Sequence, residues 1–153
     1  MIKIFKSIFF YFFVFWLPSI IVTIWNFSSR TTGDLIIEST TFIENISGEL
    51  IFFNNVLIFL LLILLGRVHK ILPQLLYGYN SLFFSFIYLI SIEYYGLVPV
   101  LSTLAKYGII EVLALAIGCS VSGVSSSSSK FKILVFIGLV LLLLAALIEQ
   151  KYI

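Results

Sequence analysis

Long apolar runs separated by short polar segments dominate the chain. A helix needs about 20 predominantly apolar residues to cross the hydrocarbon core of a bilayer. Five runs approach or reach that length, and they cover about 8–25, 50–66, 74–97, 103–124 and 131–148. The pattern predicts an all-α, polytopic membrane protein in which 1–153 forms a single membrane domain with five transmembrane helices.

The first run follows Lys3 and Lys6, as the apolar core of a signal peptide would. No small-x-small cleavage site follows the run, and it is longer and more aromatic than the core of a typical signal peptide. We therefore expect an uncleaved membrane anchor over 8–25.

The basic residues predict how these helices are oriented. With five spans, three basic pairs fall on the same side of the membrane, namely Lys3 with Lys6, Arg67 with Lys70, and Lys130 with Lys132. Lys and Arg are enriched in cytoplasmic loops. The pattern thus predicts that the N-terminus lies in the cytosol and the C-terminus outside.

Two connecting segments have recognisable patterns. The longest, 26–49, is expected on the outer side, where Asp34 could cap a helix whose apolar positions recur at helical spacing. This spacing predicts an amphipathic helix on the outer membrane surface, and a loosely ordered loop is the alternative. The serine-rich segment 125–130 is expected to be a flexible cytosolic connector.

Composition supports the membrane interpretation and excludes several functions. Of 153 residues, 61% are hydrophobic and 10% are charged, whereas soluble domains are about 45–50% apolar and about 25% charged. The net charge of +2 is too small and too scattered for nucleic-acid binding. Cys119 and His69 are the single residues of their types, so the sequence predicts no intramolecular disulfide, metal, cofactor or catalytic cluster.

The most informative polar residue is Glu111 in the fourth run, roughly 12 Å deep if the helix enters near Thr103. An acid at that depth should face protein or water rather than lipid. It shares one helical face with small residues of the kind that allow close helix packing. That face comprises Tyr107, Glu111, Ala114, Gly118 and Ser122. Glu111 is therefore expected in a helix–helix interface, as a site for a partner, a peptide or a proton, or as a structural hydrogen bond.

Other polar residues are expected to tie helices together. Asn54 and Asn55 lie one turn inside the outer end of the second run, and Asn80 lies near the inner end of the third. Side-chain amides can hydrogen-bond across helices. A second small-residue stripe on the third run is expected to dock against the stripe on the fourth, and it comprises Gly78, Ser81 and Ser85.

Three short segments resemble a known family. They read FFNNVLIFLLLILLG, LPQLLYGYN and KYGIIEVLALAIG, and they lie within the segment from Phe52 to Gly123. They are similar to the common core of the stage II sporulation protein M family, and the matching positions are Asn54, Asn55, Pro73, Asn80, Gly108 and Glu111. The chain departs from the family pattern at Ser81, Lys106 and Tyr107, where Gly, Pro and His are usual. A family role that requires the imidazole therefore has no counterpart at Tyr107.

The resemblance implies a non-catalytic subunit of the bacterial cytoplasmic membrane. The namesake of the family works with a peptidoglycan-degrading partner during engulfment, and small relatives occur beside circular bacteriocin genes. The expected role is thus in bacteriocin or peptide maturation, export or immunity, with sporulation or cell-wall remodelling as the alternative. The expected partners are membrane lipid, exporter or cell-wall machinery subunits, and a hydrophobic peptide. A small proton-coupled transporter that uses Glu111 is the alternative from a different class.

Overall fold

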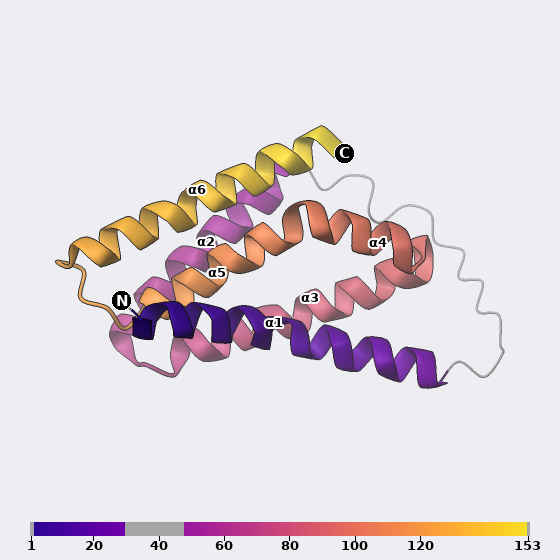
Figure 1. The fold of residues 1–153 in the computed structure, drawn as a ribbon, viewed down its shortest axis with the longest axis horizontal. Coiled ribbons are helices and arrows are strands. Elements are labelled where there is room, and N and C mark those ends of the chain that lie inside the picture. The colour runs from indigo at the N-terminus through magenta and orange to yellow at the C-terminus, as the bar shows by residue number, and fades with distance from the viewer. Residues whose placement is uncertain (1, 30–47, 153) are drawn as a thin grey trace.

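A computed structural model describes residues 2–29 and 48–152 of the protein (Figure 1). Over these ranges the secondary structure is entirely helical, which confirms the all-α prediction. The six α-helices are α1 (Ile2–Ser29), α2 (Gly48–Val68), α3 (Leu72–Tyr95), α4 (Leu97–Thr103), α5 (Ile109–Val121) and α6 (Ser129–Tyr152). A π-helical turn, η1 (Leu104–Gly108), joins α4 to α5. The predicted amphipathic surface helix lies almost wholly outside the described residues.

Three helices in the described part of the chain are long and apolar enough to cross a membrane. They cover Ile2–Trp25, Leu72–Tyr95 and Ser129–Glu149. A bent pair, Leu97–Lys106 with Ile109–Val121, gives a fourth if both pieces form one span, and Phe52–Val68 is a shorter apolar helix. Their number, length and apolarity are those of a multi-pass membrane protein.

The fourth predicted run is not a single straight helix. Helix α3 ends at Tyr95 and is followed by Gly96, whose φ of +81° lies in the left-handed region that favours glycine. The chain then turns directly into α4, six residues before the predicted start, and Pro99 lies in the first turn, where no backbone N–H is needed. The two pieces that flank η1 meet at 54°. A π turn inserts an extra residue and so interrupts the regular α-helical register.

The helices run up and down, so the chain connections gather at two ends. Figure 1 shows the N-terminus, the turn between α2 and α3, and the connection between α5 and α6 at one end. The three basic pairs lie at or beside these connections. The turn between α3 and α4 lies at the opposite end. Six of the nine basic residues of the chain therefore gather at one end of the bundle.

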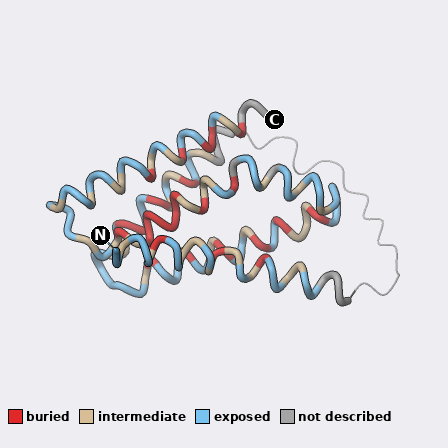
Figure 2. The backbone as a smooth tube through the Cα atoms, in the orientation of Figure 1, coloured by how far each residue is buried: buried red, intermediate tan, exposed pale blue. Residues whose placement is uncertain are grey.

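Burial is concentrated on α5, as Figure 2 shows by the red segments in the middle of the bundle. Every residue from Ala114 to Cys119 is buried. Helix α5 lies against α1, α2 and α6, and α1 also packs on α3. The outward faces carry large apolar side chains such as Phe9, Phe10 and Phe13, each more than half exposed. An apolar exterior of this extent suits lipid rather than water.

Candidate functional site between helices α2, α5 and α6

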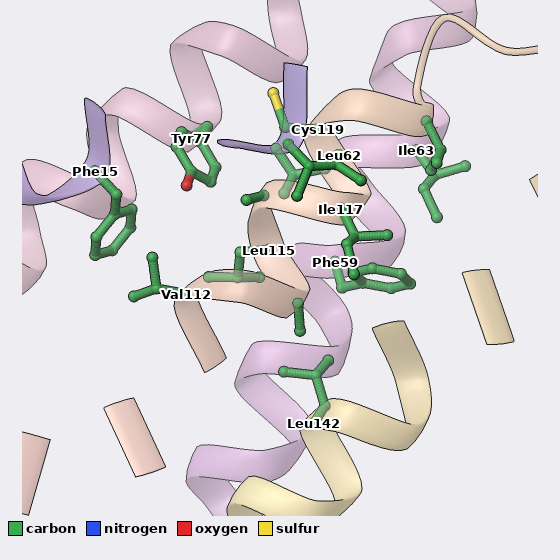
Figure 3. Close-up of a cluster of buried hydrophobic side chains, with 14 residues drawn as sticks. Phe15, Phe59, Leu62, Ile63, Tyr77, Val112, Leu115, Ile117, Cys119 and Leu142 are labelled. Carbon is green, nitrogen blue, oxygen red and sulfur yellow. The ribbon is translucent and has the colours of Figure 1, made fainter. Parts of the chain in front are cut away.

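Phe59 of α2 is the packing centre of this region. Its side chain is 0% exposed, and Figure 3 shows it among buried side chains that come from several helices. A Cβ atom built on Gly118 of α5 would lie 2.8 Å from Phe59 Cδ2, and one on Gly138 of α6 would lie 2.5 Å from Phe59 Cε2 and Cζ. The ring therefore contacts both glycines, and their lack of a side chain lets the three helices approach closely.

A second close contact joins α2 to α5 nearer the basic end. A Cβ atom on Gly66 would lie 2.3 Å from Ser122 Cβ and 2.7 Å from the Ser122 carbonyl oxygen. The Ser122 hydroxyl donates to the Cys119 carbonyl oxygen at 2.7 Å, within its own helix end. The site thus has tight backbone packing at Gly66 as well as at Phe59.

Glu111 lies at the other end of the same interface. Asn55 Nδ2 donates a hydrogen bond to Glu111 Oε1 at 2.8 Å, and it joins residues 56 positions apart in the chain. Asn55 is 9% exposed, and Glu111 is half-buried. The bond places a carboxyl group and an amide between two helices in an otherwise apolar interface.

The predicted face of the fourth run therefore meets α2. Glu111, Gly118 and Ser122 each contact that helix. Ala114 is fully buried, and Gly108 is buried against the Leu104 side chain. The side chain of Tyr107 lies outside the described part of the structure. Three of the five residues on this face thus share one neighbouring helix.

The two adjacent asparagines have different environments. Asn55 points into the interface, whereas the side chain of Asn54 is exposed. Asn80 is half-buried on α3. Of these three predicted residues, the structure therefore places Asn55 beside Glu111.

The predicted docking of the α3 stripe against the fourth run is wrong. Ser81 Oγ donates to the Phe15 carbonyl oxygen of α1 at 2.6 Å, and Ser85 Oγ lies 2.8 Å from Ser19 Oγ of the same helix. A Cβ atom on Gly78 would meet nothing within 4 Å, so Gly78 takes no part in the contact. The hydroxyl groups find partners on α1, which covers this face of α3.

Glu149 of α6 is a site residue that the sequence analysis missed. Its side chain is 2% exposed, and among the described residues its Oε2 atom has no hydrogen-bond partner. It shares a buried face of α6 with Leu142, Ala145 and Ala146. This spacing, continued outward from Gly138, is the signal that could have identified Glu149 as an interior residue.

The helix register brings Glu149 and Glu111 to similar depths. Gly118 and Gly138 both contact the Phe59 ring, so they mark a common level on α5 and α6. At 1.5 Å per residue, Glu111 lies about 10 Å from that level and Glu149 about 16 Å, in the same direction because the helices are antiparallel. The two carboxyl groups are close enough to interact electrostatically.

The site can hold a proton or a cation, because carboxyl groups bind both. In the described ranges there is no group of three or more His, Cys, Asp or Glu side chains that could hold a metal ion. Cys119 is buried two helical turns from Glu111 on the same helix, which is too far for the two to act together. The chemistry of the site therefore rests on Glu111, Glu149 and Asn55.

Comparison of the chain with protein-family models, curated proteins and solved structures finds no match. The resemblance to the stage II sporulation protein M family therefore stays a prediction from three short motifs. A function for this protein has to be argued from the geometry of its own residues.

Proposed function

We propose that the chain is a five-span protein of the bacterial cytoplasmic membrane and serves as a non-catalytic membrane subunit. The N-terminus is assigned to the cytosol and the C-terminus to the outside. The gathering of the three basic pairs at one end of the bundle supports this orientation. Helix α2 contains 21 residues, or about 31 Å at 1.5 Å per residue, which is enough for one crossing. The bent unit from α4 to α5 supplies another.

The observation that carries the subunit proposal is the bond between Asn55 and Glu111 at 2.8 Å. Both residues belong to the motifs that resemble the stage II sporulation protein M family, and they come from segments far apart in the sequence. Their contact is the arrangement expected if these motifs form a common core. On this basis we assign the chain to bacteriocin or peptide maturation, export or immunity, with exporter subunits or a hydrophobic peptide as partners. A cell-wall remodelling or sporulation complex is the alternative context.

Reporter fusions test the five-span layout. We expect cytosolic reporter activity from fusions at residue 1, within 69–71 and within 125–128, and extracytoplasmic activity from a fusion at residue 153. Residues 1 and 153 on the same side of the membrane would contradict the layout.

Copurification tests the subunit role. Tagged protein extracted from membranes with a mild detergent should recover a defined set of membrane partners, and Glu111→Ala should reduce that recovery. Glu93→Ala, which alters an exposed carboxyl group on α3, is the matched control. Exporter components among the partners would support the peptide-export context, whereas peptidoglycan hydrolases would support cell-wall remodelling. Full recovery with Glu111→Ala would remove Glu111 from the assembly role.

One observation favours a second candidate function, a small proton-coupled transporter. Glu111 has a buried carboxyl neighbour in Glu149, and intramembrane acids commonly mark proton pathways. Protein reconstituted in liposomes with a trapped pH-sensitive dye would show proton flux that Glu111→Gln abolishes and Glu93→Gln leaves unchanged. Absence of flux in the unmodified protein would reject transport.

A further inference from the structure

The outer half of the contact between α5 and α6 contains two carboxyl groups and one neutral polar partner. Glu111 accepts its hydrogen bond from Asn55, and the Oε2 atom of Glu149 has none among the described residues although the side chain is 2% exposed. Such an atom is unusual, because buried polar groups in folded proteins are nearly always hydrogen-bonded. Among the described residues, this oxygen is therefore left available to a ligand.

The charges around the pair indicate which kind of ligand fits. Asn55 of α2, which donates to the Glu111 carboxyl group, is neutral. Among the charged residues near this end whose side chains the structure describes, the others are Lys106 of η1 and Glu93 of α3, and both side chains are exposed. Burying one carboxylate in an apolar setting is costly, and a second like charge nearby adds repulsion. A positive charge between the two groups would remove both penalties.

We propose that Glu111 and Glu149 form a site for a single positive charge, which is either a proton or a monovalent metal ion. The site deepens the proposed function, since it rests on the membrane setting given above. It does not require that the charge be transported. A divalent ion such as Ca²⁺ or Mg²⁺ needs about six or more oxygen ligands. A monovalent metal ion at Glu111 and Glu149 would likewise take further oxygen ligands from water or the backbone.

Carbodiimide labelling tests the site directly, because dicyclohexylcarbodiimide modifies protonated carboxyl groups in apolar surroundings. The full-length protein in lipid nanodiscs would be labelled across a pH series, and the modified residue would be mapped by mass spectrometry. We expect label on Glu111 or Glu149. If the ligand is a proton, labelling should fall about tenfold for each pH unit above its midpoint. If the ligand is a metal ion, Na⁺ or Li⁺ at constant pH should slow labelling, whereas choline at equal ionic strength should not.

Variants show whether the two acids act as a pair. Glu149→Gln should shift the pH midpoint or the Na⁺ protection of labelling at Glu111, and Glu93→Gln should leave both unchanged. Glu149→Asp, which keeps the carboxyl group, would replace Glu149→Gln in this comparison if the Gln variant does not fold. If the pH midpoint and the Na⁺ protection of labelling at Glu111 stay the same in the position 149 variants, Glu111 and Glu149 do not act as a pair. An absence of label at both positions, with no effect of pH or Na⁺, would overturn the site.

The fusion experiments fail or succeed independently of the labelling. A contradicted topology with intact pH-dependent labelling would reject the five-span layout and retain the site. A confirmed five-span topology without labelling would retain the layout and reject the site.

Discussion

The two halves of the bundle are held together by different chemistry. Between α1 and α3, hydroxyl groups bond across the interface, as Tyr77 to the Tyr11 carbonyl oxygen at 2.8 Å and Ser81 to that of Phe15 at 2.6 Å. Aromatic rings fill the remaining space, and Phe15 lies 5.4 Å from the ring centroids of both Tyr77 and Phe84. Between α2, α5 and α6, glycines allow close backbone contact, and the polar groups at the outer end are two carboxyls and the Asn55 amide.

This difference distinguishes polar side chains that stabilise the fold from polar side chains that could bind a ligand. A neutral hydroxyl that donates to a backbone carbonyl of the next helix has its bonding capacity met within the protein. The Glu149 carboxyl lacks that partner among the described residues, and an acid in a membrane is costly to retain. We therefore regard the α1–α3 contact as scaffold and the outer end of the α2–α5–α6 contact as the working part.

The largest expected effect tests the packing centre. Phe59→Ala should lower the free energy of unfolding by about 3–5 kcal/mol, because it removes a buried ring on which three helices converge. SDS titration of the protein in mixed micelles would measure it. Phe53→Ala is the matched control on the same helix, since Phe53 is 66% exposed, and it should change the value by about 0.5 kcal/mol or less. Equal losses would mean that Phe59 is not the packing centre.

A pair of glycine substitutions tests the close backbone contact between α2 and the end of α5. Gly66→Ala should cost about 1–3 kcal/mol, because the new methyl group would lie against the Ser122 backbone. Gly78→Ala on α3 has open space, so it should stabilise the protein by up to about 1 kcal/mol through better helix propensity. The same micelle titration measures both. Similar signs for the two variants would contradict the assigned contacts.

The adjacent asparagines test the polar end of the site. Asn55→Ala should cost about 1–2 kcal/mol, because it leaves the half-buried Glu111 carboxyl without its donor. Asn54→Ala, one position away and exposed, should have almost no effect. Thermal unfolding in detergent, followed by circular dichroism, would rank the two. A larger loss from Asn54→Ala would show that the other amide bonds to Glu111.

The smallest effect is expected in the scaffold. Ser81→Ala should cost about 0.6 kcal/mol, the average of measured interhelical hydrogen bonds in a membrane protein. The control is Ser91→Ala, because Ser91 donates to Ile87 within its own helix at 2.9 Å. If Ser81→Ala is as harmful as Asn55→Ala in the same unfolding assay, the distinction between scaffold and working part does not hold.

Much of the helical layout could be predicted from the sequence. Apolar run length identified the long helices, and helical spacing grouped Glu111 with Gly118 and Ser122 on one face. These features are local, because the period of a helix fixes which side chains point the same way. The start of α4 was misplaced since it depends on Gly96, whose positive φ turns the chain abruptly.

The identity of each neighbouring helix could not be predicted. The stripe on α3 was assigned to the wrong partner because spacing shows that a face is packed without showing what covers it. Glu149 was overlooked because it lies near the end of an apolar run, where acids usually reach water. Its burial depends on the contact of α6 with α5, which is a tertiary property.

The contact of Phe59 with two glycines also restricts how the bundle could change shape. Helices α2, α5 and α6 cannot slide far past one another at this level, because the Phe59 ring fits against Gly118 and Gly138 and would meet side chains at the neighbouring positions. A rearrangement that exposed Glu111 to water would have to leave the basic end rigid and swing the opposite end outward. The π turn η1 ends three residues before Glu111, which makes it the natural hinge for such a movement.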